Sequence, residues 1–423
     1  MKQIEVSSTK NRILSNDWIH VEKNEIFLLL SFFFIGAAFA NYEPYAPFWL
    51  QELFKEESFF IIGLVFAIPS IAVAVGTALW GYFADKFGIK KIVILGLFAY
   101  AILFLSLIFT TSATYFLIAI LIGSFIGAAQ SSNFYALGAK VVNKPKTMVF
   151  AKMMVVVSLS WIIMSPVVGW INDSYPEEER ITVMKIQLMI AVIFCAISLI
   201  FCYFIKEKHV KLEKSPIIFQ QKSNLLTYFS LIFVIIIAAA FFWQTTGGFY
   251  AYSSIYFLDI LELKYSYYSL YLILKTALAV PLSILLGRVK KHNINILLVL
   301  VFAIWSFISF FFMMMFPLNW IMILIIYSIP MYPLFNITFY SILSNYTLEE
   351  RRATAFGIMN AIGTSGYVVG ILVLGLVADY FIKGIFAMLI AAFIFATVAL
   401  FTASLFYLFT KLKKENKNYS EIL

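Results

Sequence analysis

Gly81-Tyr82-Phe83-Ala84-Asp85-Lys86-Phe87-Gly88-Ile89-Lys90-Lys91 is the stretch that decides the fold, a short charged loop between two long apolar runs. Gly81 allows close helix contact, Asp85 can meet a helix N-terminus or a basic side chain, and Gly88 permits a turn. Lys90 and Lys91 would hold the loop at the inner leaflet, whose lipid headgroups are anionic. The stretch therefore predicts a tight cytoplasmic connection between two membrane helices.

The composition extends this interpretation to the whole chain. Of 423 residues, 62% are hydrophobic and only 13% are charged, which is too little polar surface for a soluble globular protein. At about 20 apolar residues per crossing, the length allows roughly a dozen helices and leaves no room for a large extramembrane catalytic domain. We therefore expect a multi-pass protein that lies in the lipid bilayer and is not an enzyme.

Charges and cysteines exclude several other classes of protein. The net charge of +9 is explained by the Lys and Arg that gather in cytoplasmic loops, so no nucleic-acid partner is expected. Cys195 and Cys202 share one apolar segment, where they are expected to be small buried hydrophobes rather than parts of a disulfide or metal cluster. All three histidines fall in predicted cytoplasmic segments. We expect no metal and no cofactor.

Charged residues and Gly/Pro clusters divide the sequence into twelve apolar stretches. These are about 26–51, 58–81, 92–112, 113–139, 148–172, 183–205, 225–258, 267–287, 294–314, 318–345, 353–378 and 384–410. With the N-terminus inside, the inner segments hold 24 Lys and Arg and the outer loops hold four. This bias predicts that both termini are cytoplasmic.

The two halves of the chain also repeat. A shift of 206 residues lays 167–173 onto 373–379 and Gly81 onto Gly287, and a shift of 205 lays 134–135 onto 339–340. Repeats of this kind are typical of transporters built from two related bundles. We predict six-helix bundles at 26–205 and 225–410, a cytoplasmic linker at 206–224, and cytoplasmic tails at 1–25 and 411–423.

These features together resemble the major facilitator superfamily. Its signature loop has a Gly, an Asp four residues on, a Gly three further and a basic pair, as Gly81 to Lys91 does. The segment 348–357, which includes Arg351 and Arg352, is similar to the start of the superfamily's helix eleven. The resemblance implies two pseudo-symmetric bundles, a monomer in the cytoplasmic membrane, and alternating access. It also implies that Asp85 bridges to helix eleven near Arg351 and Arg352 and closes the cytoplasmic side.

The motifs that bear on the coupling ion and on the direction of transport match the superfamily less well than the signature loop does. Ser165-Pro166-Val167-Val168-Gly169 is similar to a Gly-Pro-x-x-Gly stretch of exporters, with Ser in place of the first Gly. Helix four lacks the Arg that many proton-coupled members carry, which leaves sodium coupling or facilitated diffusion open. No Gly-Lys-Ser/Thr phosphate loop occurs, so a gradient rather than ATP must drive transport.

Charged residues deep in the apolar stretches are candidates for the mechanism, because each is costly in hydrocarbon. Glu43 and Lys275 both lie about 12 Å below the outer helix ends, one in each half. Glu43 is predicted to carry a transported proton, and Lys275 to pair with it or to meet an anionic group of the substrate. Alternatively, Lys275 snorkels outward and Glu43 caps a break before Pro44. Lys152 is expected to snorkel to the cytoplasm.

Polar and aromatic residues gather in the helices that line the cavity of superfamily members. The predicted substrate-binding residues are Lys275, Asn133, Gln244, Asn336, Tyr332, Trp243, Gln130 and Asn360. Hydrogen bonds between helices are the alternative role for such side chains. Asp173, Asp259 and Asp379 at helix ends are expected to face water or to cap neighbouring helices.

The sequence thus predicts a secondary transporter that moves a small organic solute, coupled to protons and leaning to export. Uptake of a sugar or metabolite is one alternative, since amides and aromatic faces also bind sugars. A membrane sensor that keeps the fold without transport is the other.

Overall fold

The computed structural model describes residues 21–46, 58–110, 112–176, 179–207, 231–287, 292–328, 331–346, 352–381 and 384–420. Within these ranges every regular element is helical, which confirms the predicted all-α membrane fold. Most of the predicted N-terminal tail and of the linker 206–224 lies outside the described residues.

The elements of the two halves follow the chain in order. The N-terminal half contains α1 (Lys23–Tyr42), η2 (Glu43–Tyr45), α3 (Phe59–Phe87), α4 (Ile89–Ile108), α5 (Ala113–Val141), α6 (Lys146–Ser174) and α7 (Arg180–Phe204). The C-terminal half contains α9 (Leu231–Gly247), α10 (Tyr250–Ile255), η4 (Tyr256–Ile260), α11 (Tyr265–Gly287), α12 (His292–Met315), α13 (Trp320–Tyr327), α14 (Met331–Tyr346), α15 (Arg352–Tyr380) and α16 (Gly384–Ser420).

Ten of the described helices are long and apolar enough to cross a membrane. The two other predicted spans are divided, into α9, α10 and η4 for 225–258 and into α13 and α14 for 318–345. Hydropathy does not reveal such breaks, because the apolar run continues through them. At the first break, a Cβ on Gly248 would lie 2.5 Å from the carbonyl carbon of Gly370 in α15. Glycine there lets the two helices approach closely.

The ends of the helical region differ from the prediction. Helix α1 begins at Lys23, inside the predicted tail 1–25, and α16 continues to Ser420, past the predicted end at residue 410. Lys, Leu and Glu in 411–415 favour a helix without any apolar face. Much of the predicted C-terminal tail is therefore an extension of α16.

The decisive loop is as tight as predicted. Helix α3 ends at Phe87 and α4 begins at Ile89, so that Gly88 alone connects them, with a φ of 103°. A side chain would be strained at that φ. Lys90 Nζ donates to the carbonyls of Tyr203 and Ile205, each at 2.7 Å. These carbonyls end α7 and lack helical partners, so Lys90 ties the loop to the last turn of that helix.

Helix boundaries reproduce the repeat seen in the sequence. A shift of 206 residues carries Lys146–Ser174, the bounds of α6, onto Arg352–Tyr380, the bounds of α15. The same shift carries Phe59, which begins α3, onto Tyr265, which begins α11. The repeat is therefore a repeat of structure, although its sequence signal consists of only a few matched positions.

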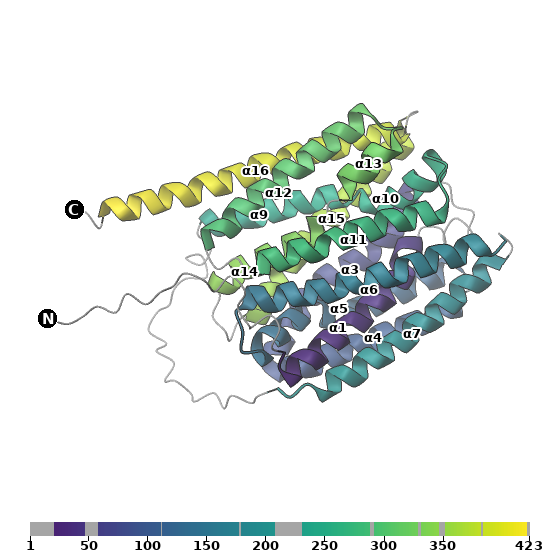
Figure 1. Cartoon of the computed structure of the whole chain (residues 1–423), viewed down its shortest axis with the longest axis horizontal. Coiled ribbons are helices and arrows are strands. Elements are labelled where there is room, and N and C mark those ends of the chain that lie inside the picture. The colour runs from purple at the N-terminus through teal and green to yellow at the C-terminus, as the bar shows by residue number, and fades with distance from the viewer. Residues whose placement is uncertain are drawn as a thin grey trace.

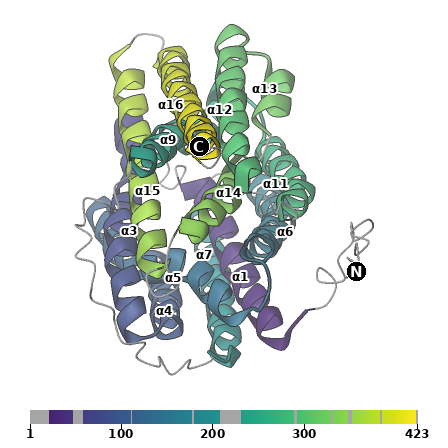
Figure 2. The same cartoon turned by 90° about the vertical axis from the view of Figure 1, so that its left-hand side faces the viewer.

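Contacts between the halves run along two helix pairs. Figure 2 shows α15 beside α3 on one side of the molecule and α11 beside α6 on the other. These pairs are counterparts, because the repeat relates α3 to α11 and α6 to α15. In Figure 1 the helices run roughly along the long axis, and α1 begins and α16 ends at the same end of the bundle. We call that end the inner end, after the predicted topology, and the other the outer end.

Candidate substrate cavity

A cavity of about 550 Å³ lies between the halves. Helices α1, α3, α4, α5 and α6 line it from one half, and α9, α10, α11, α12 and α15 from the other. Most of its wall is aromatic or aliphatic, with a limited set of polar side chains. Its size and lining match those of sites for small organic ligands.

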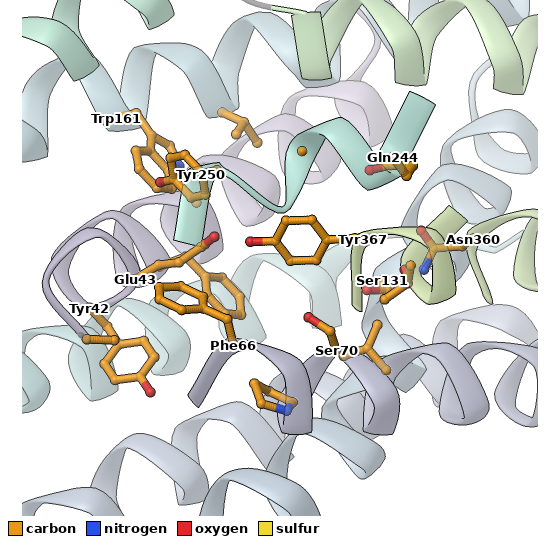
Figure 3. Close-up of a pocket in the computed structure, with 18 of the residues that line it drawn as sticks. Tyr42, Glu43, Phe66, Ser70, Ser131, Trp161, Gln244, Tyr250, Asn360 and Tyr367 are labelled. Atoms are coloured by element: carbon orange, nitrogen blue, oxygen red, sulfur yellow. The ribbon is translucent and has the colours of Figure 1, made fainter. Parts of the chain in front are cut away.

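Glu43 lies at the outer part of this cavity, just after α1. Pro44 follows it. Because proline has no N–H to continue the hydrogen bonds of the α-helix, α1 stops at Tyr42 and the short helix η2 begins at Glu43, which itself keeps helical backbone angles. This break places the carboxylate in the cavity near Tyr250 and Phe66 (Figure 3). No hydrogen bond reaches the Glu43 carboxylate from the described residues.

Lys275 lies in α11 and reaches the same cavity from the other half. Its ammonium donates to the hydroxyl of Tyr271 at 3.1 Å and lies 4.7 Å from the ring centroid of Tyr250. Aromatic faces stabilise a cation electrostatically. The charges of Glu43 and Lys275 act on each other, but no ion pair within 4.0 Å joins these two described residues. An acid and a base from opposite halves thus share one chamber without direct contact.

Neutral polar groups occupy another part of the cavity. Ser131 on α5, Gln244 on α9 and Asn360 on α15 lie together there, with Tyr367 between them and Glu43 (Figure 3). Gln130, beside Ser131, also lines the cavity. The chamber therefore has an ionic part and an amide-rich part.

Most predicted substrate-binding residues line this cavity. Those that do are Lys275, Gln244, Trp243, Gln130 and Asn360, and the predicted proton carrier Glu43 lines it as well. Trp243 stacks on Phe335 with ring centroids 4.0 Å apart. The side chains of Asn336 and Tyr332 lie outside the described part of the structure.

Asn133 is a correction to the prediction. Its side chain is fully buried away from the cavity, and its Nδ2 donates to the carbonyl of Ala129 at 2.9 Å. A sequence does not fix the rotation of α5, and this rotation turns Gln130 and Ser131 to the cavity and Asn133 into the bundle.

Tyr367 was not among the predicted residues. It stands on α15 beside Gly363, Gly366 and Gly370, which let α15 pack closely against α9. A Cβ on Gly366 or Gly370 would collide with the backbone of α9, at Phe241 and Thr245 respectively. A large polar side chain set among small residues was the available signal.

Lys152 is a second correction. Its ammonium lies 2.7 Å from Oε1 of Glu25, and Lys144 lies 2.6 Å from Oε2 of the same carboxylate. Lys152 is only 6% exposed, so it is buried in an ionic cluster rather than snorkelling to water. This cluster links the start of α1 to α6 and to the loop before it.

At the outer end, aspartates cap helices of the opposite half. Asp379, at the end of α15, accepts from the backbone N–H of Phe59 at 2.8 Å and of Phe60 at 3.0 Å, the first residues of α3. Asp173, at the end of α6, accepts from the backbone N–H of Ser266 in α11 at 3.0 Å. The expectation that these aspartates cap neighbouring helices is confirmed for both. Asp259 has a side chain outside the described residues.

Tyrosines fill the same interfaces one layer deeper. Tyr45 Oη is 2.8 Å from Ser269 Oγ, beside Gly169. Tyr252 donates to the carbonyl of Ile371 at 2.8 Å, and its hydroxyl lies against Gly375. Gly169 and Gly375 are counterparts in the repeat, so each glycine makes room for a tyrosine at the outer interface.

At the inner end, aromatic rings join the halves. Tyr135 of α5 stacks on Tyr340 of α14 at 4.7 Å, and Phe150 of α6 meets Phe356 of α15 at 5.9 Å. Thr77 of α3 also contacts Gly357, where a Cβ would lie 2.5 Å from the Thr77 carbonyl oxygen. Contacts between the halves therefore lie on both sides of the cavity.

The predicted gating residues are only partly described. Asp85 is exposed on the last turn of α3, and Lys91 is exposed at the start of α4. Arg351 and the side chain of Arg352 lie outside the described residues. The predicted bridge from Asp85 to helix eleven therefore stays a prediction.

Comparison with known proteins agrees with this geometry. The human organic anion transporter MFSD10 (TETRAN) is 15% identical with a TM-score of 0.67, over 90% of this chain and 99% of that one. The proton:xylose symporter XylE is 14% identical with a TM-score of 0.71, over 92% and 95%. The nucleoside transporter NupG is 17% identical with a TM-score of 0.64, over 90% and 98%. At such identities these likenesses show the fold alone.

Curated proteins gave no match to this sequence. The sequence model of the Major Facilitator Superfamily, in contrast, matches residues 28–371. That range includes the signature loop, three of the four helices that pair between the halves and most of the fourth, α15, and every cavity residue named above. The chain belongs to the major facilitator superfamily.

Proposed function

We propose that this chain is a secondary active transporter that moves a small organic solute across the cytoplasmic membrane as a monomer. The observation that carries the proposal is the pair Glu43 and Lys275, an acid and a base from opposite halves in one cavity. Ionisable residues are costly in a membrane and are found there where they work on ions or substrates. Contacts between the halves on both sides of the cavity supply the two gates that alternating access requires.

Glu43 suits the role of proton carrier. Without a hydrogen-bond donor among the described residues, its charged form relies on cavity water and on the distant charge of Lys275. Binding a proton removes the cost of keeping a charged carboxylate away from bulk water, and so does pairing with a cationic group of the solute. If the cavity opens to one side of the membrane and then to the other, the carboxyl can take up a proton on the first side and release it on the second. The missing helix-four Arg leaves sodium coupling as the alternative.

Lys275 suits the recognition of an anionic group. Two tyrosine rings and one hydroxyl hold its ammonium inside the cavity, which argues against snorkelling to water. A carboxylate or phosphate of a solute could approach it without displacing an ion pair with Glu43. We therefore expect an anionic or zwitterionic solute.

The direction of transport rests on motif resemblance alone. Gly169 of the exporter-like stretch lies against Ser269 and Tyr45, and this contact requires a small residue whichever way the solute moves. Export is therefore our proposal from the resemblance, and the gradients decide direction in the cell.

The test uses purified protein in liposomes. A thermal-shift screen over organic anions, amino acids, sugars and cationic drugs first identifies a ligand, because a ligand of the folded state raises the melting temperature. Flux of that ligand is then measured with and without an imposed pH step. We expect the pH step to drive accumulation in the wild type and not in Glu43→Gln, with downhill exchange retained.

Lys275→Ala is the matched variant from the other half. It should weaken an anionic hit by about 1–3 kcal/mol and leave a neutral hit nearly unchanged. Full proton-driven accumulation in Glu43→Gln would remove Glu43 from the mechanism. A ligand that binds but is never moved in any gradient would favour a sensor, and sugar hits indifferent to both variants would favour sugar uptake.

A further inference from the structure

The polar lining of the cavity is divided by chemistry as well as by position. Glu43 and Lys275 are the formally charged side chains among the lining residues. Ser131, Gln244 and Asn360 lie in the other part, and Figure 3 shows Tyr367 between these three residues and Glu43. Amides and hydroxyls both donate and accept hydrogen bonds, so this part of the cavity suits neutral polar groups rather than ions.

The neutral groups are available to a ligand. Across the described residues, the side chains of Gln130, Ser131, Gln244 and Asn360 make no hydrogen bond with the protein. Other polar side chains on the same helices differ, since Asn133, Thr245 and Thr246 each donate to a carbonyl of their own helix. Polar groups inside a protein need partners. These four side chains, on three helices, face the cavity, and a solute can supply the hydrogen-bond partners that the protein does not.

The two parts lie at different depths. Asn360 is 20 residues from the outer end of α15 at Tyr380, and Lys275 is 10 residues from the outer end of α11 at Tyr265. Asp379 caps the start of α3, so the outer end of α15 is level with the start of α3, and the repeat relates the start of α3 to that of α11. At 1.5 Å per residue the Cα atoms differ by roughly 15 Å in depth.

The lining of the cavity as a whole is largely apolar. Phe66, Val73, Tyr100 and Trp161 contribute rings and methyl groups to the lining. Methylene groups are favourable in such surroundings, and extra charges are not.

We propose that the solute is an elongated zwitterion with a neutral polar tail. This inference rests on the proposed function and specifies its substrate class. An ammonium of the solute lies at Glu43 and a carboxylate lies at Lys275, as in an α-amino acid head. An apolar chain spans the middle, and an amide or hydroxyl at the far end bonds to Gln244 and Asn360. The head faces the outer end and the tail faces the inner end.

Three amino acids that share a four-carbon chain separate these roles. Nε-acetyl-L-lysine has the zwitterionic head, four methylene groups and a neutral amide tail. L-norleucine has the head and an apolar chain without the amide, and L-lysine ends in a cation. Binding of each is measured by titration calorimetry and thermal shift to the purified wild type and to Gln244→Leu, Asn360→Leu and Lys275→Ala. Asn133→Leu is the control, since its amide lies outside the cavity.

We expect Nε-acetyl-L-lysine to bind about 3- to 10-fold more tightly than L-norleucine, the factor of one or so neutral hydrogen bonds. Gln244→Leu and Asn360→Leu should remove that advantage and leave L-norleucine unchanged. Lys275→Ala should weaken both ligands alike, and L-lysine should bind less well than either. Asn133→Leu should keep the advantage.

Several results would overturn the inference. Equal binding of Nε-acetyl-L-lysine and L-norleucine would show that the tail is not recognised, and tight L-lysine binding would show that the inner part accepts ions. No binding of Nε-acetyl-L-lysine, with another solute transported in a manner that depends on Glu43 and Lys275, would reject the zwitterion class and keep the transporter. Failure of the proposed function is distinct from these, because then no solute would move in any gradient.

Discussion

The two ends of the contact between the halves are built differently. At the inner end, residues that are counterparts in the repeat touch each other, since Phe150 and Phe356 are 206 positions apart and their ring centroids are 5.9 Å apart. At the outer end, the two capping aspartates are counterparts that do not meet. Asp173 and Asp379 are also 206 positions apart, yet each caps a different helix of the opposite half.

Symmetry explains what this difference means. Residues related by a two-fold axis can touch each other only close to that axis. The inner contact is therefore one aromatic cluster on the pseudo-axis, whereas the outer contact consists of two equivalent sites away from it. We infer that the outer end has two latches that act separately, and that the inner end has one latch whose parts act together.

The largest effect is expected from one substitution made at the two ends of the α3/α15 pair. In Gly357→Ala, the new Cβ would lie 2.5 Å from the carbonyl oxygen of Thr77, and in Gly375→Ala it would lie 3.1 Å from the Cα of Phe60 and collide with the Tyr252 hydroxyl. Overpacking of this kind costs about 1–3 kcal/mol. Gly357→Ala should open the inner end, and Gly375→Ala should open the outer end.

Spin-label distances measure both openings in a background without Cys195 and Cys202. Labels at Lys86 and Ile358 report the inner end, and labels at Ile61 and Tyr380 report the outer end, since these positions lie on α3 and α15 and are exposed. The two variants should shift opposite label pairs. If both variants open the same end, the two halves do not rock against each other as alternating access requires.

An intermediate effect is expected at the inner aromatic cluster. Phe150 and Phe356 are fully buried and in contact, and an aromatic pair adds about 0.5–1.5 kcal/mol beyond its buried area. Phe150→Leu and Phe356→Leu should each favour the inner-open state, and the double variant should add little to either single change. The fraction of inner-open molecules in the same label experiment gives the coupling energy. Strictly additive changes would contradict a single shared latch.

The comparison also shows how far the sequence could lead. The shift of 206 residues places Asp173 on Asp379 and Gly169 on Gly375 in the sequence alone, and the structure finds all four at matching interfaces. The tight loop was equally readable, because Gly88 has the φ of 103° that favours glycine. Features of this kind can be predicted because they depend on residue identity and on the local backbone conformation that the residue favours.

Other features depend on how each helix is rotated about its axis and on which helices it packs against, and a single sequence determines neither. Gln130 lines the cavity and Asn133 does not, although the two lie less than one turn apart on α5. Lys152 was expected to reach water because it lies close to a helix end, and its actual partner, Glu25, is 127 positions away in the sequence. The pairing of Tyr135 with Tyr340 likewise becomes visible only when α5 and α14 are placed side by side.

The smallest effect is expected at the outer aspartates, and it decides whether the two outer latches are separate. Asp→Asn keeps an acceptor oxygen and removes the charge that favours a helix N-terminus, which is worth about 0.3–1 kcal/mol at an exposed site. Asp173→Asn and Asp379→Asn should each raise the outer-open population by about two- to fivefold. The two sites share no partner, because one caps α11 and the other caps α3. Their energies should therefore add in the double variant, in contrast to the inner pair.

The outer labels at Ile61 and Tyr380, with a second pair at Ser174 and Lys264, measure each interface on its own. A double variant no more open than either single one would mean that the outer end, like the inner end, opens as one unit.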